Sequence, residues 1–347
     1  MNSAEGSPSP YYALALQATC RAINGLDDVS EARARMGRTL ERLHRQIIGS
    51  RAFIGSDVRL VVLPEYFLTG YPMGEPIAVW AQKAALDVDG PEYERMAKTC
   101  QQLGIYLSGN AYERDAHFPG IYFQTSFLID DQGEVVLRYR RLNSMYAPTP
   151  HDVWDRYLEI YGADSIFPVA RTALGNIGAI ASEEILYPEV ARCLAMRGAE
   201  IFLHSTSEAF GDGDTPKDIA KKARAIENLA YVVSANSAGI TDTPIPASSA
   251  DGGSKVIDYR GKIVAAAATG ESMTAHAEID PAAVRRTRRR PGMMNLLARQ
   301  RFELYAASYA ENSFHPPNTM AEGEPDRSLF RRTQEATIRR LEEAGLI

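Results

Sequence analysis

The sequence predicts an α/β layered domain, and two observations lead to this prediction. Short runs rich in Val, Ile, Tyr and Phe alternate with helical patterns through the first two-thirds of the chain, an order typical of helices packed on sheets. A run of strands then follows between residues 254 and 279. After Asp280 the composition changes to a basic and then a Pro- and Gly-containing stretch. We therefore expect one main domain over 1–285 and a C-terminal arm over 286–347.

The strands are predicted from their residue types, because β-branched and aromatic residues dominate each run and turn residues bound it. In chain order the predicted strands are 12–17, 59–63, 104–109, 122–129, 134–139, 177–181, 200–204, 231–236, 254–258, 263–267 and 274–279.

The helices are predicted from apolar periodicity and from their end signals. In the longest, over 29–49, Met36, Leu40, Leu43 and Ile47 recur at three- and four-residue spacing and form one apolar face. Proline near the start, glycine at the end or a threonine N-cap marks the others. These further helices cover 91–103, 188–198, a stretch that begins at Thr215-Pro216, and about 328–344.

Composition excludes several classes of function. The net charge of -6 gives no overall attraction to nucleic acid or to an anionic membrane, and no apolar run approaches the roughly 20 residues that span a bilayer. The basic run 285–290 is interpreted as a solvated or subunit-facing surface rather than a nucleic-acid site. The N-terminus lacks the basic and apolar regions of a secretory signal, so we expect a cytoplasmic protein.

Neither the cysteines nor the histidines indicate a metal site. Cys20, Cys100 and Cys193 have no metal-type spacing, and the six histidines do not cluster. We therefore expect no metal and no other cofactor.

The first segment that suggests chemistry is Val61-Val-Leu-Pro64-Glu65-Tyr66. An apolar strand ends in a proline, which cannot continue a central ladder, and then presents Glu65. A carboxylate at the end of a buried strand loses part of its hydration, so its pKa should rise toward the range of a general base. Read from these residues alone, Glu65 could equally cap a helix or pair with an arginine.

Two further segments place polar groups at strand ends. Arg141 ends the strand that follows the turn 130–134, where a solvated basic end is the simplest interpretation. Ser182 follows the apolar strand 177–181, and Glu183, Glu184 and a helix that begins at Pro188 come next. A lone serine at such a position is most often a small turn residue.

Taken together, the three segments resemble those of the nitrilase superfamily, the carbon-nitrogen hydrolases, and of its amidase-like branch. The resemblance covers about residues 10–285 and includes later segments at 108–113, 223–239 and 258–261. It implies a four-layer αββα sandwich and hydrolysis of a non-peptide C–N bond of a small amide or nitrile through an acyl-enzyme. It also implies association through helices into a homodimer or a larger homo-oligomer, in which the C-terminal arm over 286–347 contacts a neighbouring subunit.

The resemblance also implies roles for individual residues. Glu65 matches the general base, Arg141 stands where the family has the lysine that holds the oxyanion, and Ser182 stands where the family has its nucleophilic cysteine. An arginine can still donate hydrogen bonds to an oxyanion. The segment between Arg141 and Asp152 favours a carboxamide over a nitrile, because it resembles the amidase branch.

Other residues are predicted to bind the substrate or to wall its pocket. Asp152 falls at the place of a second acid of the family, although it could instead cap a helix over 153–159. The remaining predicted pocket residues are Tyr66, Tyr146, Glu183, Tyr187 and His204, with packing or a hydrogen-bonded core histidine as the alternatives.

Three interpretations of Ser182 remain open at this stage. Ser182 could replace a natural cysteine in an inactive variant that traps substrate, because the change from thiol to hydroxyl is nearly isosteric. It could be native in an enzyme that runs a slower or different acyl transfer. It could also be native, with Arg141, in a pseudoenzyme that binds a ligand or a partner.

Overall fold

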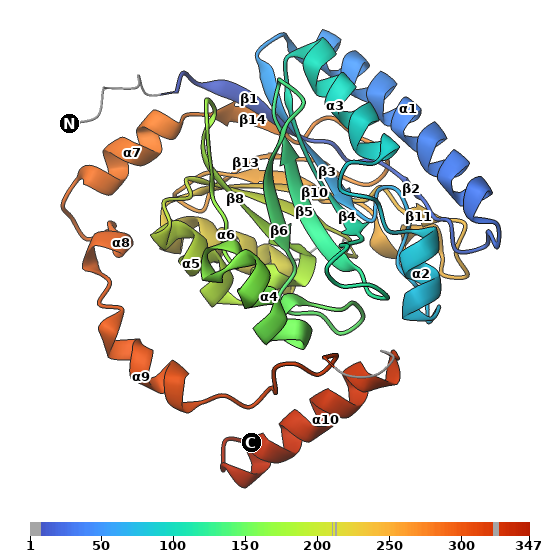
Figure 1. Cartoon of the computed structure of the whole chain (residues 1–347). Coiled ribbons are helices and arrows are strands. Elements are labelled where there is room, and N and C mark those ends of the chain that lie inside the picture. The colour runs from blue at the N-terminus through green and yellow to red at the C-terminus, as the bar shows by residue number, and fades with distance from the viewer. Residues whose placement is uncertain (1–7, 210, 212–213, 322–325) are drawn as a thin grey trace.

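Two six-stranded sheets stack face to face between outer helices, as Figure 1 shows for the computed structural model, which describes residues 8–209, 211, 214–321 and 326–347. The first sheet has the order β14 (His276–Ile279), β1 (Tyr11–Ala15), β3 (Val58–Glu65), β4 (Tyr106–Glu113), β5 (Phe123–Ile129) and β6 (Val135–Arg140). The second has the order β13 (Ile263–Ala266), β12 (Lys255–Ile257), β10 (Tyr231–Asn236), β9 (Ile201–Thr206), β8 (Gly175–Ala181) and β7 (Ala170–Thr172). A small pair joins β2 (Cys20–Arg21) to β11 (Ile240–Thr241).

Helices cover the outer face of each sheet (Figure 1). α1 (Val29–Ile54) and α3 (Pro91–Leu103) pack on the first sheet, and α5 (Pro188–Met196) and α6 (Pro216–Asn228) pack on the second. Shorter helices are α2 (Ile77–Lys83) and α4 (Trp154–Tyr161), with 3₁₀ turns at Pro150–Val153, Ala163–Ser165, Ser182–Leu186 and Ala247–Ala250. This arrangement confirms the predicted αββα sandwich.

The two faces of β3 show why the sheets stack, because both faces carry apolar side chains. In β3, Leu60 and Val62 belong to the buried cluster between the two sheets, whereas Val61 and Leu63 belong to the cluster under α1. Successive side chains of a strand point to opposite faces, so an uninterrupted apolar strand can only be satisfied when both faces are covered.

The observed elements differ from the predicted ones mainly at their ends, and β3 gives the informative case. The predicted strand ends at Leu63, but β3 continues through Pro64 to Glu65. Proline lacks a backbone N–H, and the pairing of β3 with β4 shifts register between Val62 and Glu65. The irregularity accommodates Pro64 and brings Glu65 into the strand itself.

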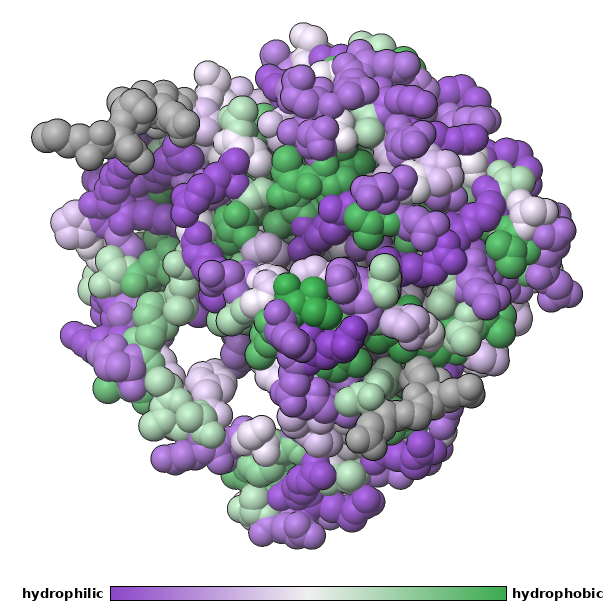
Figure 2. Space-filling view, in the orientation of Figure 1, coloured by the Kyte–Doolittle hydropathy of each residue, from purple (hydrophilic) through white to green (hydrophobic). Residues whose placement is uncertain are grey.

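After β14 the chain continues through α7 (Pro281–Arg289), α8 (Leu296–Arg299), α9 (Glu303–Glu311) and α10 (Ser328–Glu343), and the predicted C-terminal arm covers most of this stretch. It runs around the body of its own chain, and open gaps separate part of it from the body (Figures 1 and 2). The predicted solvated surface at 285–290 is only partly exposed, because Arg285 pairs with Glu200 and Arg288 donates to backbone carbonyls of the body.

Among the described helices, none is both long enough and apolar enough to cross a membrane.

Candidate active site

Glu65, Arg141 and Ser182 line one cavity of about 980 Å³. They come from three different strands: Glu65 ends β3, Arg141 follows β6, and Ser182 follows β8. β3 belongs to the first sheet and β8 to the second, and the Ser205 hydroxyl of β9 donates to the Leu63 carbonyl of β3 across the interface at 2.7 Å. The stacking of the two sheets therefore creates the site.

Glu65 is held firmly inside the protein. Its side chain is 1% exposed, and Gln124 Nε2 donates to its Oε1 at 2.6 Å while Arg141 Nη1 lies 3.5 Å from the same oxygen. Gln124 also donates to Asn110 at 2.9 Å, which fixes the amide in turn. The next residue, Tyr66, has a φ of 59°, so the chain leaves the strand abruptly. The carboxylate is thus fixed by Gln124 of β5 and by Arg141, which follows β6.

Arg141 lies between two carboxylates. Its Nε donates to the Asn143 carbonyl at 2.7 Å, its Nη1 donates to Gln124 at 2.9 Å and contacts Glu65, and its Nη2 donates to Glu183. Burial opposes its charge, yet Glu65 and Glu183 hold its pKa above the usual value. A guanidinium carries five N–H groups, so these four contacts leave one for a substrate oxygen.

Ser182 occupies a strained turn at the end of β8. Its φ of 47° lies in the left-handed region, which costs a residue other than glycine on the order of 1–3 kcal/mol. The Ser182 carbonyl accepts a hydrogen bond from His204 Nε2 at 2.8 Å, and Lys217 Nζ donates to the Ser182 hydroxyl at 3.3 Å. Strain of this kind persists where the surroundings enforce it, and it is concentrated at functional sites.

Glu184 fastens this turn to the end of β6. It is fully buried and accepts hydrogen bonds from the backbone N–H groups of Leu142 and Asn143 at 2.8 and 2.9 Å and from the Tyr139 hydroxyl at 2.7 Å. Burial raises its pKa, and Arg141 and these donors act in the opposite direction. Glu184 therefore sets the position of Ser182 relative to Arg141.

The other predicted pocket residues separate into two groups. Tyr66, Tyr146 and Glu183 line the cavity with Ser182. Asp152 and Tyr187 do not; they line a neighbouring cavity of about 680 Å³, which Glu183 also borders. His204 lines neither cavity and is buried behind Ser182 as a hydrogen-bonded core histidine.

Local hydrogen bonding explains why Asp152 lies outside. Its carboxylate accepts from the Thr149 backbone N–H at 2.8 Å and from the Thr149 hydroxyl at 2.7 Å, and from the Thr319 hydroxyl of the arm. This is a capping box in which Thr149 is the N-cap and Asp152 is the third residue of the turn, so the predicted capping role is close but one turn displaced.

Sequence reasoning missed Gln124, Lys217 and the residues of α10. Gln124 lies inside an apolar strand and Lys217 is the second residue of α6, so neither position stands out by spacing. Arg327 and Phe330 reach the cavity from the arm, about 150 residues after Ser182. Their proximity is a product of tertiary structure.

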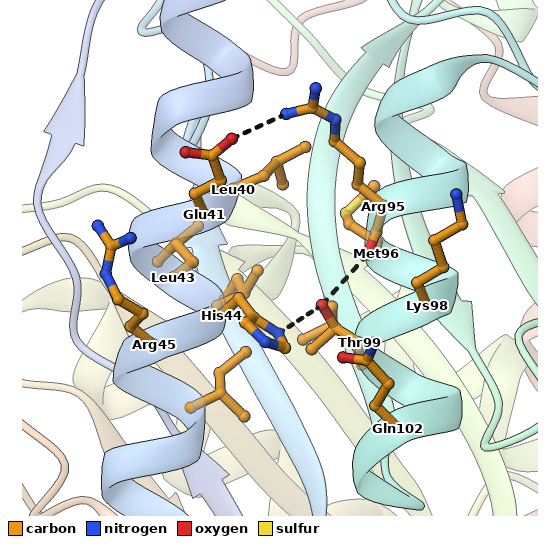
Figure 3. Close-up of a pocket in the computed structure, with 13 residues that line it drawn as sticks. Leu40, Glu41, Leu43, His44, Arg45, Arg95, Met96, Lys98, Thr99 and Gln102 are labelled. Carbon is orange, nitrogen blue, oxygen red and sulfur yellow. Dashed lines mark hydrogen bonds and ion pairs between the residues drawn. The ribbon is translucent and has the colours of Figure 1, made fainter.

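Another, smaller cavity of about 370 Å³ lies between α1 and α3 (Figure 3). Glu41 and Arg95 face each other across it at 3.5 Å, and His44 Nδ1 lies 3.0 Å from the Thr99 hydroxyl. It shares no lining residue with the cavity of Ser182 and holds none of the predicted site residues.

Within the part of the chain that the structure describes, no three His, Cys, Asp or Glu side chains are grouped as metal ligands.

The fold and this cavity point to one class of protein, the carbon-nitrogen hydrolases. The chain belongs to the carbon-nitrogen hydrolase family, whose model matches residues 22–289. The match covers every strand from β3 to β14 and all the predicted catalytic residues.

Individual relatives match this chain at low sequence identity and over part of its length. A protein named as the hydrolase in the pqqF 5' region of Pseudomonas protegens is 32% identical over 58% of this chain and 64% of its own length. A formamidase of Bacillus cereus is 27% identical over 61% of this chain and 59% of its own length. The matched region thus spans less than two-thirds of each of these two relatives.

Solved structures show the same fold. A carbon-nitrogen hydrolase from Helicobacter pylori G27 superposes with a TM-score of 0.64 at 20% identity, over 86% of this chain and 98% of its own. A double mutant of the amidase from Nesterenkonia sp. AN1, in complex with acrylamide, gives 0.59 at 21% identity, over 89% and 100%.

Proposed function

We propose that the protein hydrolyses a carboxamide of a small molecule through an acyl-enzyme at Ser182. The observation that carries this proposal is the presence of Glu65, Arg141 and Ser182 on one cavity. The formamidase among the relatives supports an amide substrate. So does a mutant of the Nesterenkonia amidase, which is described with covalent addition of the acetamide moiety of fluoroacetamide at its active-site cysteine.

In the proposed reaction the Ser182 hydroxyl gives up its proton as its oxygen bonds to the amide carbon, and ammonia or an amine leaves with that proton as the C–N bond breaks. The remaining N–H of Arg141 donates to the oxyanion that forms. In a buried site, a hydrogen bond to developing charge stabilises the transition state more than it would in water. Glu65 is the general base for the water that attacks the acyl-enzyme, and Gln124 and Arg141 fix it in place. Water then releases the acyl group from Ser182 as a carboxylic acid.

A second candidate function is ligand binding without turnover. The observation that favours it is the double departure from the family pattern, with Ser182 in place of cysteine and Arg141 in place of lysine. A serine hydroxyl ionises far less readily than a thiol. In this case the cavity binds the amide but the protein does not hydrolyse it.

The experiment compares the natural chain with Ser182→Cys and Ser182→Ala against a panel of aliphatic and aromatic amides. Ammonia release measures turnover, and mass spectrometry detects an acyl adduct. We expect turnover or an adduct with the natural chain or with Ser182→Cys, and neither with Ser182→Ala. Ser165→Ala is the control variant: Ser165 lies outside the cavity, so this substitution should leave the activity unchanged. Binding of an amide without turnover or adduct in any form would establish the second candidate instead.

A further inference from the structure

The Ser182 hydroxyl has its hydrogen bond with an amine rather than with the predicted base. Among the described residues, Lys217 Nζ is its side-chain partner, at 3.3 Å. The hydrogen bonds and ion pair of Glu65 go to Gln124 and Arg141. The group within reach of the Ser182 proton is therefore Lys217, which lines the same cavity.

Helix α6 places Lys217 there. Thr215 caps the helix by accepting from the Asp218 N–H at 3.1 Å, and Pro216 occupies the first position, so Lys217 projects from the first turn. Its Nζ also donates to the Thr206 hydroxyl at the end of β9, at 3.1 Å. The amine is thus held between two hydroxyl groups from neighbouring strand ends.

The partners of Lys217 differ in kind from those of the next lysine on the helix. Lys221 pairs with Glu208 at 2.5 Å and with Asp218 at 3.3 Å, as a buried ammonium should. No described carboxylate lies within 4.0 Å of Lys217 Nζ. A hydroxyl can donate to a neutral amine as well as accept from an ammonium, so both contacts of Lys217 are compatible with an amine that takes up a proton.

We propose that Lys217 is the general base that activates Ser182, as a Ser–Lys dyad; this inference rests on the proposed function. As Ser182 Oγ bonds to the amide carbon, its proton passes to the neutral amine of Lys217. The resulting ammonium gives the proton to the departing nitrogen as the C–N bond breaks. In the second half, Glu65 takes a proton from water as the water attacks the ester and passes it to Lys217, which is neutral again. Lys217 gives this proton to the Ser182 oxygen through the same contact as the ester C–O bond breaks, so that Glu65 and Lys217 both end as they began.

The dyad also explains how a serine can stand where the family has cysteine. A thiol is already a few per cent thiolate at neutral pH, whereas a serine hydroxyl requires an adjacent base. The two residues would therefore function as a pair, with Lys217 required by Ser182 and dispensable for a cysteine at the same position.

The test measures amide hydrolysis by Lys217→Ala and Lys217→Arg, each made with Ser182 and with Ser182→Cys. With Ser182, we expect both variants to lose about 10²- to 10⁴-fold in kcat, the usual contribution of a general base. The arginine variant keeps hydrogen-bond donors at this position, but its guanidinium cannot lose a proton and therefore cannot act as the base. Ammonia, methylamine or ethylamine should restore turnover to Lys217→Ala with a rate that increases with amine concentration.

With Ser182→Cys, the change at Lys217 should lower kcat less than about tenfold, because a thiol depends less on an adjacent base.

The controls separate a failure of this inference from a failure of the proposed function. Lys222→Ala, on the same helix but paired with Asp214, should leave the rate unchanged, and thermal unfolding checks the fold of each variant. Lys217→Met preserves the length of the side chain if the alanine variant does not fold. Full activity of Lys217→Arg, no rescue by any amine, or turnover by Ser182→Cys alone would overturn the dyad. No turnover by either the serine or the cysteine form would overturn the proposed function itself.

Discussion

At the residue scale, the central feature of the site is the chain of charges Glu65–Arg141–Glu183. Glu65 and Arg141 are 1% and 5% exposed, so each charge is stable inside the protein only because the other is present. Arg141 therefore has a structural task in addition to the proposed contact with an oxyanion. Substitutions can separate the structural role of Arg141 from its proposed role as an oxyanion donor.

Replacing Arg141 with alanine should destabilise the fold by about 3–5 kcal/mol, because it leaves the buried Glu65 carboxylate without its counter-charge. Arg141→Lys retains the charge and should lose much less. Urea denaturation followed by circular dichroism measures both free energies. A loss below about 1 kcal/mol for Arg141→Ala would show that the pair is not stabilising in this sense.

His204 should make the stability of the protein depend on pH. Burial, together with the charge of Lys221, holds its pKa well below the usual value, although the Ser182 carbonyl acts in the opposite direction. The unfolded chain takes up the proton near pH 6.5 while the folded protein does not, so this contribution to stability is complete above about pH 6.5 and is lost as the pH falls toward the folded pKa.

Unfolding experiments on the natural chain and on His204→Gln at about pH 7.5 and 5.5 test this sign. The stability of the natural chain relative to the variant should fall by about 1.4 kcal/mol between the two pH values, since only the natural chain has this buried imidazole. His315→Gln, an exposed histidine, serves as the control. A difference that grows at low pH would contradict the assignment of a depressed pKa.

At the scale of elements, the caps and turns at strand ends decide which polar residues face the substrate. The turn over 150–153 uses the Asp152 carboxylate for its own backbone, whereas the turn over 182–186 leaves the Ser182 hydroxyl facing the cavity. Both acids and hydroxyls are common at such positions. Which of them is available to a ligand depends on the local hydrogen bonds.

Asp152→Ala should therefore affect stability more than catalysis. Loss of the capping box and of the contact with Thr319 should cost about 1 kcal/mol, with kcat changed by less than about threefold. Thermal unfolding and amide hydrolysis by the same preparation give the two values. A fall in kcat of about a hundredfold with an unchanged melting temperature would restore the predicted role of Asp152 in the site.

At the scale of the whole molecule, the arm completes the cavity. Arg327 donates to the Tyr146 carbonyl at 2.6 Å, to the Tyr122 hydroxyl at 3.1 Å and to the Glu75 carbonyl, and Phe330 is buried beside it. These contacts fasten α10 over the cavity that holds Ser182, although α10 lies far from the site in the sequence (Figure 1).

Arg327→Ala should weaken substrate binding without changing the chemical step. We expect KM to rise about tenfold and kcat to stay within about threefold, because three hydrogen bonds of roughly 1 kcal/mol each hold the wall of the cavity. Arg332→Ala is the matched control, since Arg332 is exposed on the same helix. An unchanged KM would mean that α10 does not shape the binding site.

Self-association stays a prediction, and α9 is the surface on which to test it. Apolar side chains of the arm are exposed there (Figure 2), and Leu304 is 66% exposed. Light scattering after size exclusion should give at least twice the chain mass of 38.2 kDa. Leu304→Asp should lower that mass if α9 forms the contact. A single-chain mass for the natural protein would contradict the predicted oligomer.

Local patterns in the sequence are sufficient to predict the layered architecture and to place Glu65, Arg141 and Ser182 at the ends of strands. Apolar runs and helix-end signals are local properties, and Pro91, Gly104 and the Thr215-Pro216 cap set helix ends where they were predicted. The sequence signals that mark Glu65 and Ser182 as site residues also lie within a few neighbouring residues. Patterns of this kind survive in a single sequence because short-range sterics and hydrogen bonding produce them.

Which side chains contact each other in the site depends on the way the chain folds. Lys217 reaches Ser182 across 35 positions of the chain, and Arg327 reaches Tyr146 across 181. Asp152, next to the site in the family pattern, is used by its own turn and by Thr319. Such contacts depend on how two sheets and an arm stack. Spacing along the chain does not encode that stacking, because it arises only when distant apolar faces are buried against each other.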